Sequence, residues 1–330
     1  MQNNRIPYRH IKHIAAGALL LFGRYAVARL LSVRWGKKLH WPKPVERLQI
    51  ECPSGNIWTA EFDGPVNAPQ LVFIHGINAN ASQWYYQREF FREHNRLIFL
   101  SLPLRLPKRG PYRLDIHTLA ADLNSVLTQL DIGQAVVYGH SMGGMVLLQY
   151  CTQYFNPAHV KAIVLHGASY TNPLTTNPYS FLLKPLEQPV LIPMLKFLKR
   201  HRWVFNVLSG INFLNGLSFL FYRYVHFAGK QTANQLLYVL AMAPTNDTGA
   251  VAESILQLMH YDVSRQLQHI KMPVLILNGL HDRLNTVGSN LYLQQHLPQA
   301  QLTFIDAGHQ GMVEKHREVN TAIQEFIENM

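Results

Sequence analysis

Residues 139–143 read Gly-His-Ser-Met-Gly, a Gly-x-Ser-x-Gly pattern that can present a serine for nucleophilic attack. The apolar run 135–138 before it has the length of a buried strand, and the pattern after it is helical. Such a sharp turn from strand to helix holds the serine in strained backbone geometry and exposes its hydroxyl. Gly139 and Gly143 flank the serine at positions where a Cβ would collide across the turn. The segment therefore predicts that Ser141 is a nucleophile.

A serine hydroxyl attacks poorly until a base accepts its proton and a third group orients that base. Two later apolar runs, 274–278 and 301–305, have the length of strands, and each is followed within four residues by a candidate partner. Asp282 follows the first run and His309 follows the second. The order serine, acid, histidine, with each partner after a strand, matches enzymes that carry this turn. The sequence therefore predicts a triad of Ser141, Asp282 and His309.

Nearby residues offer alternatives to this triad. His281 lies directly beside the acid, so it cannot also be the base which that acid orients. Asp306 precedes His309 too closely to orient its ring, and we expect it to cap the following loop. His166 ends a predicted strand at the same edge of the sheet, where structural packing and substrate contact both remain open.

The oxyanion of an ester intermediate requires backbone N–H groups, and the amide of Met142, directly after the nucleophile, is one candidate. The second should come from the loop that follows the predicted strand 70–74. Gly76 allows this loop to turn its backbone inward, so we expect the amide of Ile77 to be the second donor. Asn78 is either a turn residue or part of the pocket lining. The seventeen histidines show no H-x₃-H or HExxH spacing, and we expect neither a metal nor a cofactor.

From residue 47 onward the chain alternates strand and helix patterns. Short apolar runs of the kind found in buried parallel strands dominate. The pattern predicts an α/β fold with a mostly parallel eight-stranded sheet covered by helices. The predicted strands span 47–52, 57–62, 70–74, 97–102, 135–138, 162–166, 274–278 and 301–305, and the predicted helices span 84–93, 116–130, 142–155, 289–297 and 317–328.

About a hundred residues between 166 and 274 show no convincing strand, which is too long for a loop within a compact domain. We expect a helical cap over residues 168–265, inserted after the sixth strand between core segments 47–167 and 266–330. The stretch 181–228 is rich in Leu, Phe, Ile, Tyr and Trp, and its basic residues outnumber its single acid, Glu187. The insertion is either simply core or a lid that lines an acyl pocket and touches a membrane, and both can hold together.

These motifs together resemble the serine α/β-hydrolase superfamily, in particular its capped lipase and esterase branch with monoacylglycerol lipase-like enzymes. The resemblance covers about residues 47–330, and it implies the α/β-hydrolase fold together with the acid, base and oxyanion amides at the positions given above. Residues 101–110 depart from the family, because they are basic, apolar and proline-stiffened where such proteins often have an Asp and a Gly-x-Gly-x-Ser loop. The motifs that carry the resemblance are His75-Gly76, residues 139–144, residues 279–282 and Gly308-His309.

The net charge of +11 is concentrated at the N-terminus, where residues 1–50 hold ten Lys and Arg against one acid. The remaining chain lacks basic patches interleaved with aromatic residues, which argues against nucleic acid and favours an anionic membrane surface as partner. The apolar run 14–23 is too short to span a bilayer. We therefore expect residues 1–46 to form an interfacial, membrane-contacting segment on the cytoplasmic side. A single span, a cleaved signal and packing on the body remain open.

The combined features predict a serine hydrolase of carboxylic esters that acts in lipid metabolism on monoglycerides, lysophospholipids or similar acyl esters. The same triad also serves C–C bond hydrolases and acyltransferases, since fold and triad do not fix the substrate. A binding protein without catalysis would be expected to have lost a triad member. Two cysteines, Cys52 and Cys151, are too few for a disulfide framework, and we expect both to be buried. Acyl length, head group and oligomeric state remain open.

Overall fold

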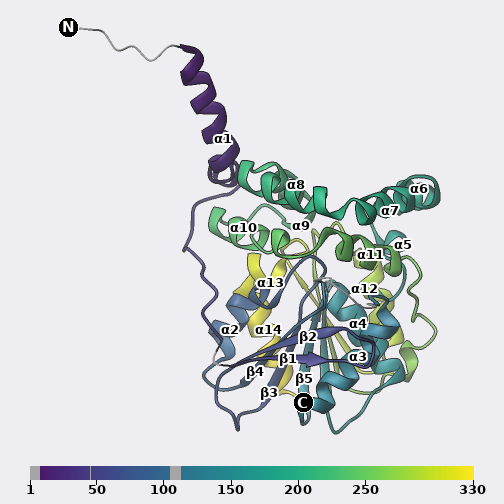
Figure 1. Cartoon of the computed structure of the whole chain (residues 1–330). Coiled ribbons are helices and arrows are strands. Elements are labelled where there is room, and N and C mark those ends of the chain that lie inside the picture. The colour runs from purple at the N-terminus through teal and green to yellow at the C-terminus, as the bar shows by residue number, and fades with distance from the viewer. Residues whose placement is uncertain (1–7, 45, 105–112) are drawn as a thin grey trace.

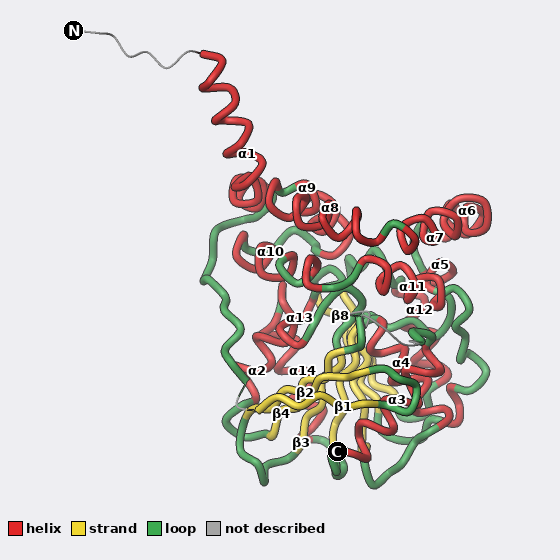
Figure 2. The backbone as a smooth tube through the Cα atoms, viewed as in Figure 1, coloured by secondary structure: helices red, strands yellow, loops and turns green. Residues whose placement is uncertain are grey.

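One eight-stranded sheet organises the protein, whose computed structural model describes residues 8–44, 46–104 and 113–330 (Figures 1 and 2). The strand order is β1-β2-β4-β3-β5-β6-β7-β8. β2 pairs antiparallel with β1 and β4, and all other neighbours are parallel. Every predicted strand is present within two residues, so the predicted fold class is confirmed. The strands are β1 (Glu46–Glu51), β2 (Ile57–Asp63), β3 (Gln70–Ile74), β4 (Arg96–Ser101), β5 (Ala135–His140), β6 (Val160–His166), β7 (Val274–Gly279) and β8 (Ala300–Ile305).

Helices cover both faces of the sheet, which explains why the central strands are apolar along their whole length. On β3 and β5, Val72 and Val137 face one core layer, while their neighbours Phe73 and Tyr138 face the other. The first layer includes α3 (Ile116–Gln129), α4 (Met142–Gln153) and α12 (Val287–His296), and the second includes α2 (Tyr85–Phe91), α13 (Gly311–Glu314) and α14 (His316–Glu328).

The start of the first core helix differs from expectation. A 3₁₀ turn, Ala81–Trp84, precedes α2. The side chain of Asn80 accepts a hydrogen bond from the amide of Ser82 at 3.0 Å, so Asn80 is the N-cap. The sequence pattern predicts only a helix over residues 84–93 and gives no sign of the short turn.

The segment between β6 and β7 folds into a group of helices beyond the carboxyl ends of the strands (Figure 1). A single bridge, Thr171 to Asp262, closes its base. We call this group of helices the cap. Its action as a lid stays a prediction. Its helices are α5 (Pro173–Thr176), α6 (Ser180–Leu186), α7 (Ile192–Arg200), α8 (Arg202–Asn215), α9 (Leu217–His226), α10 (Ala233–Leu240) and α11 (Thr248–Leu258), with a π-helical turn at Glu187–Leu191 and 3₁₀ turns at Ala243–Thr245 and Leu267–His269.

The two halves of the N-terminal helix α1 (Tyr8–Leu30) have different surroundings. Its first half projects away from the body, whereas its second half packs on α8, α9 and α10 (Figure 1). Ala28 is fully buried there, and the chain that follows pairs through Arg34 O with Ala233 N at 2.8 Å. Of the alternatives left open for the N-terminal segment, packing on the body is therefore seen for the second half of this helix. None of the described helices alone is long and apolar enough to cross a membrane; α8 and α9 together pass that test but meet at a bend of 86°.

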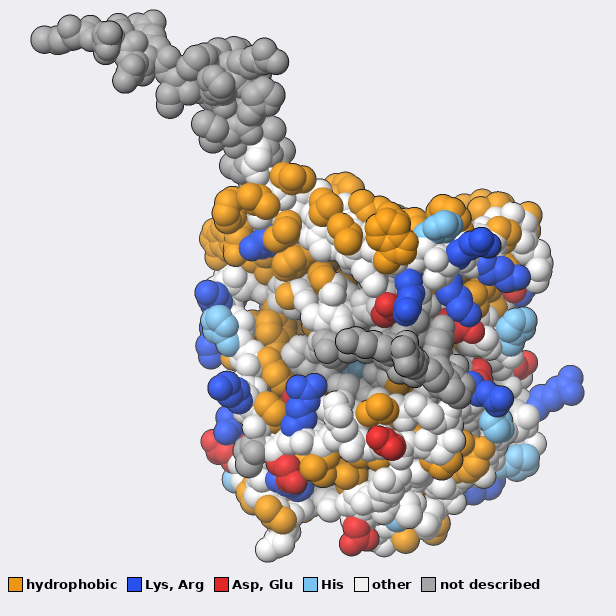
Figure 3. Space-filling model, viewed as in Figure 1, with side chains coloured by type: hydrophobic (Ala, Val, Ile, Leu, Met, Phe, Trp, Pro, Cys, Tyr) orange, Lys and Arg blue, Asp and Glu red, His pale blue; other side chains and the backbone are white. Residues whose placement is uncertain are grey.

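Exposed apolar side chains gather on α1 and on the helices α6–α9 along the same side of the molecule (Figure 3). Trp203 on α8 is 71% exposed and Phe181 on α6 is 79% exposed, although aromatic side chains of this size are mostly buried in soluble proteins. We call this region the apolar cap surface, and it includes Leu20, Leu21, Phe22, Phe181, Leu182, Trp203, Val207, Leu217, Leu220 and Phe221.

Candidate active site

Ser141 lies at the turn between β5 and α4 with φ 52° and ψ −120°, a left-handed backbone that is strained for any residue except glycine. A Cβ at Gly139 would come within 2.6 Å of the Cα of Gly144, and one at Gly143 would collide with the carbonyl of Ile74. The turn therefore tolerates only glycine on both sides, as the sequence pattern predicts. The strain is concentrated at the one residue whose hydroxyl it presents.

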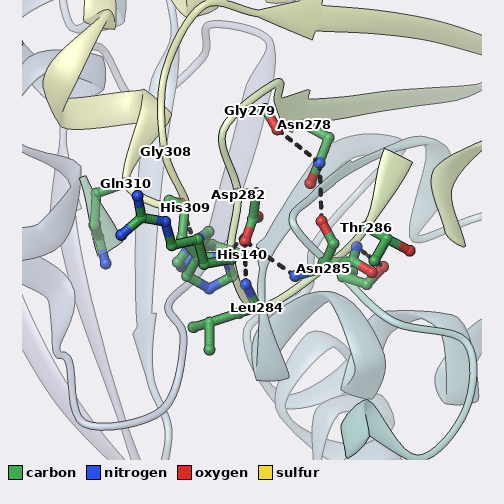
Figure 4. Close-up of polar contacts among 12 residues, drawn as sticks. His140, Asn278, Gly279, Asp282, Leu284, Asn285, Thr286, Gly308, His309 and Gln310 are labelled. Atoms are coloured by element: carbon green, nitrogen blue, oxygen red, sulfur yellow. Dashed lines mark hydrogen bonds and ion pairs between the residues drawn. The ribbon is translucent and has the colours of Figure 1, made fainter. Parts of the chain in front are cut away.

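Asp282 and His309 form a buried pair at the same edge of the sheet (Figure 4). The Nδ1–H of His309 donates to Asp282 Oδ2 at 2.8 Å. The other carboxylate oxygen accepts from the amides of Leu284 at 2.7 Å and Asn285 at 3.0 Å. These bonds fix the carboxylate, and the carboxylate fixes the ring so that Nε2 is left to accept a proton.

Strand order brings the three predicted triad residues to one edge. Their strands β5, β7 and β8 run parallel in the β5-β6-β7-β8 part of the sheet, so the segments after their carboxyl ends lie on the same side. Two bonds tie the nucleophile turn to its neighbours, the end of β6 and the loop after β8. The amide of Ser141 donates to the carbonyl of His166 at 2.8 Å, and the ring of His140 donates through Nε2 to the carbonyl of His309 at 3.1 Å.

His140, directly before the serine, connects the nucleophile turn to the loops on either side. Gln83 donates through Nε2 to its Nδ1 at 2.7 Å, so the ring accepts at Nδ1 and donates at Nε2. Burial, followed by the neighbouring His309 and His166 rings, lowers the pKa of His140 well below its usual value. The ring is therefore a neutral structural bridge and does not compete with His309 for a proton.

The loop after β3 lies directly against the nucleophile turn. A Cβ at Gly76 would come within 2.8 Å of His140 Nδ1 and 3.1 Å of Ser141 Cβ. His75 holds this loop, because its Nδ1 donates to the carbonyl of Gly76 at 2.7 Å. In the described part of the chain, the amides of Ile77 and Met142 have no hydrogen-bond partner. Both predicted oxyanion donors are thus available to a ligand.

Two of the alternatives lie away from this group. His281 is exposed, and its ring contacts Asp306 at 3.0 Å. Asp306 also pairs with Lys230, so its side chain bonds to other side chains and does not cap the loop as expected. His166 is buried against Tyr138 at 2.6 Å, and desolvation lowers its pKa to about 3. These contacts favour the structural interpretation of His166.

Three residues of the site carry no signal in the sequence. Gly167 has φ 58°, and a Cβ there would come within 2.9 Å of His309 Cε1. Buried Glu314 accepts from the amides of Gly308 at 3.0 Å and Ala228 at 2.9 Å, which joins the cap to the histidine loop. Gln83 stands in an ordinary helix start. No spacing rule identifies these three, because each acts through a contact that only the fold creates.

A cavity of about 320 Å³ lies within the cap beside the oxyanion loop. Its wall includes Asn78, the residue after Ile77, and Tyr222, whose hydroxyl accepts from Asn78 Nδ2 at 2.7 Å. Asn78 has φ 58°, so it serves both as a turn residue and as pocket lining. The rest of the wall is mainly apolar and comprises Phe205, Leu208, Ser209, Asn212, Phe213, Ser218, Leu240, Ala243, Pro244, Thr248 and Val251.

The departure from the family pattern at residues 101–110 is only partly visible, since 105–112 lie outside the described residues. Both cysteines are free and buried, as predicted.

Among the described residues, no three His, Cys, Asp or Glu side chains are grouped as metal ligands.

Known proteins place this chain by similarity. The family model described as alpha/beta hydrolase fold matches residues 69–316. The chain is 24% identical over 269 residues to 3-oxoadipate enol-lactonase 2 of Acinetobacter baylyi, a match that covers 79% of this chain and 89% of the relative. An esterase from Exiguobacterium antarcticum superposes with a TM-score of 0.69 at 19% identity and covers 85% of this chain and 98% of its own. A membrane phospholipase A, described as a bacterial virulence factor, superposes with a TM-score of 0.65 at 20% identity and covers 97% of this chain and 96% of its own.

Proposed function

Since the chain belongs to the α/β-hydrolase family, we propose that it hydrolyses carboxylic esters with Ser141 as nucleophile, His309 as base and Asp282 as the residue that orients the base. One observation carries the proposal: a serine in left-handed backbone geometry shares a sheet edge with a buried, hydrogen-bonded aspartate–histidine pair. The similarity to an enol-lactonase and an esterase supports ester-type substrates.

The proposed reaction proceeds in two halves. The Ser141 oxygen attacks the ester carbonyl carbon while Nε2 of His309 takes the hydroxyl proton. The tetrahedral intermediate collapses, the bond to the alcohol oxygen breaks, and His309 gives its proton to that oxygen. Water, activated by the same ring, then attacks the acyl-enzyme and releases the acid. Asp282 keeps the ring in the tautomer that can accept at Nε2, which its 2.8 Å bond to Nδ1 supports.

The negative oxygen of the tetrahedral intermediate needs donors that are in place before reaction. We assign this role to the backbone amides of Ile77 and Met142. Both lie beside Ser141 and lack a partner within the described chain. Gly76 contributes by its small size, because a side chain there would displace the loop from the nucleophile turn.

The cap cavity supports a lipid-like acyl group. Asn78, the residue after Ile77, belongs to its lining, and its wall is mostly apolar. A volume of about 320 Å³ is at the lower end of the range of small-molecule pockets. An acyl chain that enters from the oxyanion loop would gain about 0.8 kcal/mol for each methylene it buries. Monoglycerides and lysophospholipids fit this description.

A membrane-bound lipid source would account for the N-terminus and the cap together. The first half of α1 projects from the body, and the apolar cap surface adjoins its packed half (Figures 1 and 3). The similar membrane phospholipase A covers 97% of this chain, so that match includes most of residues 1–46. We therefore propose a membrane-associated enzyme whose basic N-terminal segment contacts anionic lipid on the cytoplasmic side.

A fluorophosphonate probe tests the nucleophile. We expect the full-length protein to be labelled and the Ser141→Ala variant to be unlabelled, with nearly the same melting temperature and turnover reduced by about 10⁶. Labelling that persists in the Ala variant would contradict the assignment. An aryl ester assayed beside a diketone separates ester hydrolysis from C–C bond hydrolysis, since only the first should be cleaved.

A further inference from the structure

Helix α9 presents two side chains, Tyr222 and His226, toward the catalytic residues. They are four residues apart and therefore lie on one face of the helix. Their rings stack with centroids 4.6 Å apart and planes 22° apart. The hydroxyl of Tyr222 is bonded to Asn78 beside the oxyanion loop. One face of this helix thus reaches from the oxyanion loop toward the catalytic histidine.

His226, the last residue of α9, lies beside His309. The two ring centroids are 5.6 Å apart. Nδ1 of His226 is shielded from solvent, and among the described residues it has no hydrogen-bond partner. Burial, followed by the nearby His309 ring, lowers the pKa of His226 to about 3, so the imidazole is neutral. A buried imidazole nitrogen without a partner is unfavourable by itself and calls for a ligand group that completes it.

The backbone around His226 fixes where this ring stands. Its carbonyl accepts from the amide of Gln310 at 2.9 Å. A Cβ at Gly308 would come within 2.7 Å of the same carbonyl oxygen. Glu314 then joins Ala228 to Gly308 through one carboxylate oxygen. The residues on both sides of His309 are therefore tied to the end of α9, and the ring of His226 is positioned with them.

The reaction defines which part of an ester reaches this ring. His309 delivers a proton to the oxygen of the departing alcohol, so the alcohol must lie against His309. In the proposed function the acyl chain enters a different space, the cavity whose lining includes Asn78. The ring of His226 lies next to His309 and is absent from the lining of that cavity, so it is placed to contact the alcohol half of the ester.

We propose that His226 hydrogen-bonds a hydroxyl of the leaving alcohol, so that this enzyme selects esters of polyols such as glycerol over esters of simple alcohols. The proposal rests on the ester hydrolysis proposed above and adds to it the class of alcohol. His226 is a specificity-determining residue in this account, and its stacking on Tyr222 restrains the orientation of its ring.

Two substrates with the same octanoyl chain provide the test: 1-octanoylglycerol and propyl octanoate, which differ only in the two free hydroxyls of the alcohol. The full-length protein should show a clearly higher kcat/KM for the glyceryl ester. His226→Phe keeps an aromatic ring against Tyr222 and removes both nitrogens. We expect this change to lower the ratio of the two kcat/KM values by tenfold or more, because a site built around a hydroxyl rejects the analogue that lacks it.

A second variant separates recognition from packing. His226→Gln restores a donor and an acceptor on a side chain of similar length, and it should recover much of the ratio. His281→Phe, at an exposed histidine bonded to Asp306, is the matched control and should keep the wild-type ratio. Fluorophosphonate labelling reports whether each variant retains a folded, reactive site.

Three outcomes would overturn the proposal. An equal fall for both esters in His226→Phe, not relieved in His226→Gln, would show that the ring only supports the fold. A wild-type ratio near one would show that the hydroxyls are not recognised. A wild-type protein that takes up the probe but cleaves neither ester would reject the polyol ester class while leaving the nucleophile assigned, whereas absence of both labelling and cleavage would reject the proposed function itself.

Discussion

The catalytic edge, meaning the carboxyl ends of β5, β7 and β8 with the loops that follow them, differs from the cap in how it is held together. At the edge, buried polar groups bond to one another: Asp282 accepts three hydrogen bonds, and His140 is bonded through both ring nitrogens. In the cap, apolar side chains line a cavity and cover an exposed surface, although bonds such as that between Tyr222 and Asn78 tie its helices to the core. Directional bonds fix atoms to fractions of an ångström, whereas apolar contacts fix only volume. Under the proposed function, the edge would set the type of reaction and the cap would select the substrate.

The largest effect should follow from breaking the edge. Asp282→Asn keeps the shape of the side chain but disfavours the tautomer that accepts at Nε2, so we expect turnover to fall by about 10⁴ with the fold intact. Steady-state kinetics and a melting curve measure the two quantities. The matched control is Asp306→Asn, which changes an exposed carboxylate bonded to His281, and it should alter turnover less than threefold. If Asp306→Asn lost its turnover while Asp282→Asn kept it, the acid of the triad would be wrongly assigned.

The cap should act on selectivity instead. Extending the acyl chain from two to eight carbons should raise kcat/KM by about 10³, at roughly 0.8 kcal/mol for each buried methylene. Ser209→Trp fills the cavity and should flatten this series by about a hundredfold at eight carbons relative to two. Val207→Trp, on the exposed side of the same helix α8, should leave the series steep. A flat wild-type series would point to small polar esters and make the cavity irrelevant to binding.

The N-terminal helix α1 tests the role of the exposed cap region further, because only the second half of this helix packs on the cap. Removing residues 1–18 deletes Arg5, Arg9 and Lys12, each worth about 1 kcal/mol near an anionic surface. Binding to anionic vesicles at low salt should weaken by about a hundredfold while the melting temperature stays unchanged. Co-sedimentation measures this. If the full-length protein remains in the supernatant, membrane attachment is excluded under those conditions.

Removing residues 1–38 should behave differently. That cut also takes away Ala28, which is fully buried, and Arg34, whose carbonyl bonds to Ala233. We therefore expect a lower melting temperature together with the loss of vesicle binding. A purely peripheral N-terminus predicts no change in melting temperature for either deletion.

The buried histidines of the edge give the smallest effect, a dependence of stability on pH. Burial lowers the pKa of His75 to about 4 and that of His166 to about 3, whereas an imidazole in the unfolded chain titrates near 6.5. Between these values the unfolded chain binds more protons, so the stability present above pH 6.5 is lost as the pH falls toward 4. Each ring should lower the free energy of unfolding by about 2 kcal/mol between pH 7 and pH 5.

Urea unfolding at both pH values measures this loss. In His166→Gln the difference between pH 7 and pH 5 should shrink by about 2 kcal/mol. His260→Gln, at an exposed histidine, is the control and should retain the full difference. An unchanged difference in His166→Gln would show that this ring is not kept neutral by burial.

The same contrast explains what the sequence could reveal. Strands such as β3 were predictable to the residue. A short uninterrupted apolar run such as Leu71–Ile74 is typical of a parallel strand whose two faces are both covered by helices. Ser141, Asp282 and His309 were found because each follows such a strand. Gln83 and Glu314 were not, since each acts by binding a residue more than fifty positions away, His140 or Ala228, and no local pattern marks them. The insertion was predicted only as a helical cap without individual helices, because helices broken at closely spaced prolines have no single periodicity.

Gly167 has a consequence for how this gene tolerates change. Its backbone is left-handed, and the space where a Cβ would stand is already filled by the ring of His309 and a carboxylate oxygen of Asp282, at 2.9 and 3.3 Å. Any missense change of this codon adds a Cβ, and even alanine would push on the pair that orients the base. A saturation mutagenesis survey scored by activity should therefore mark position 167 as intolerant as the triad itself, although glycine contributes no functional group to the reaction. Intolerance in such a survey identifies the space that a mechanism needs as well as the atoms that it uses.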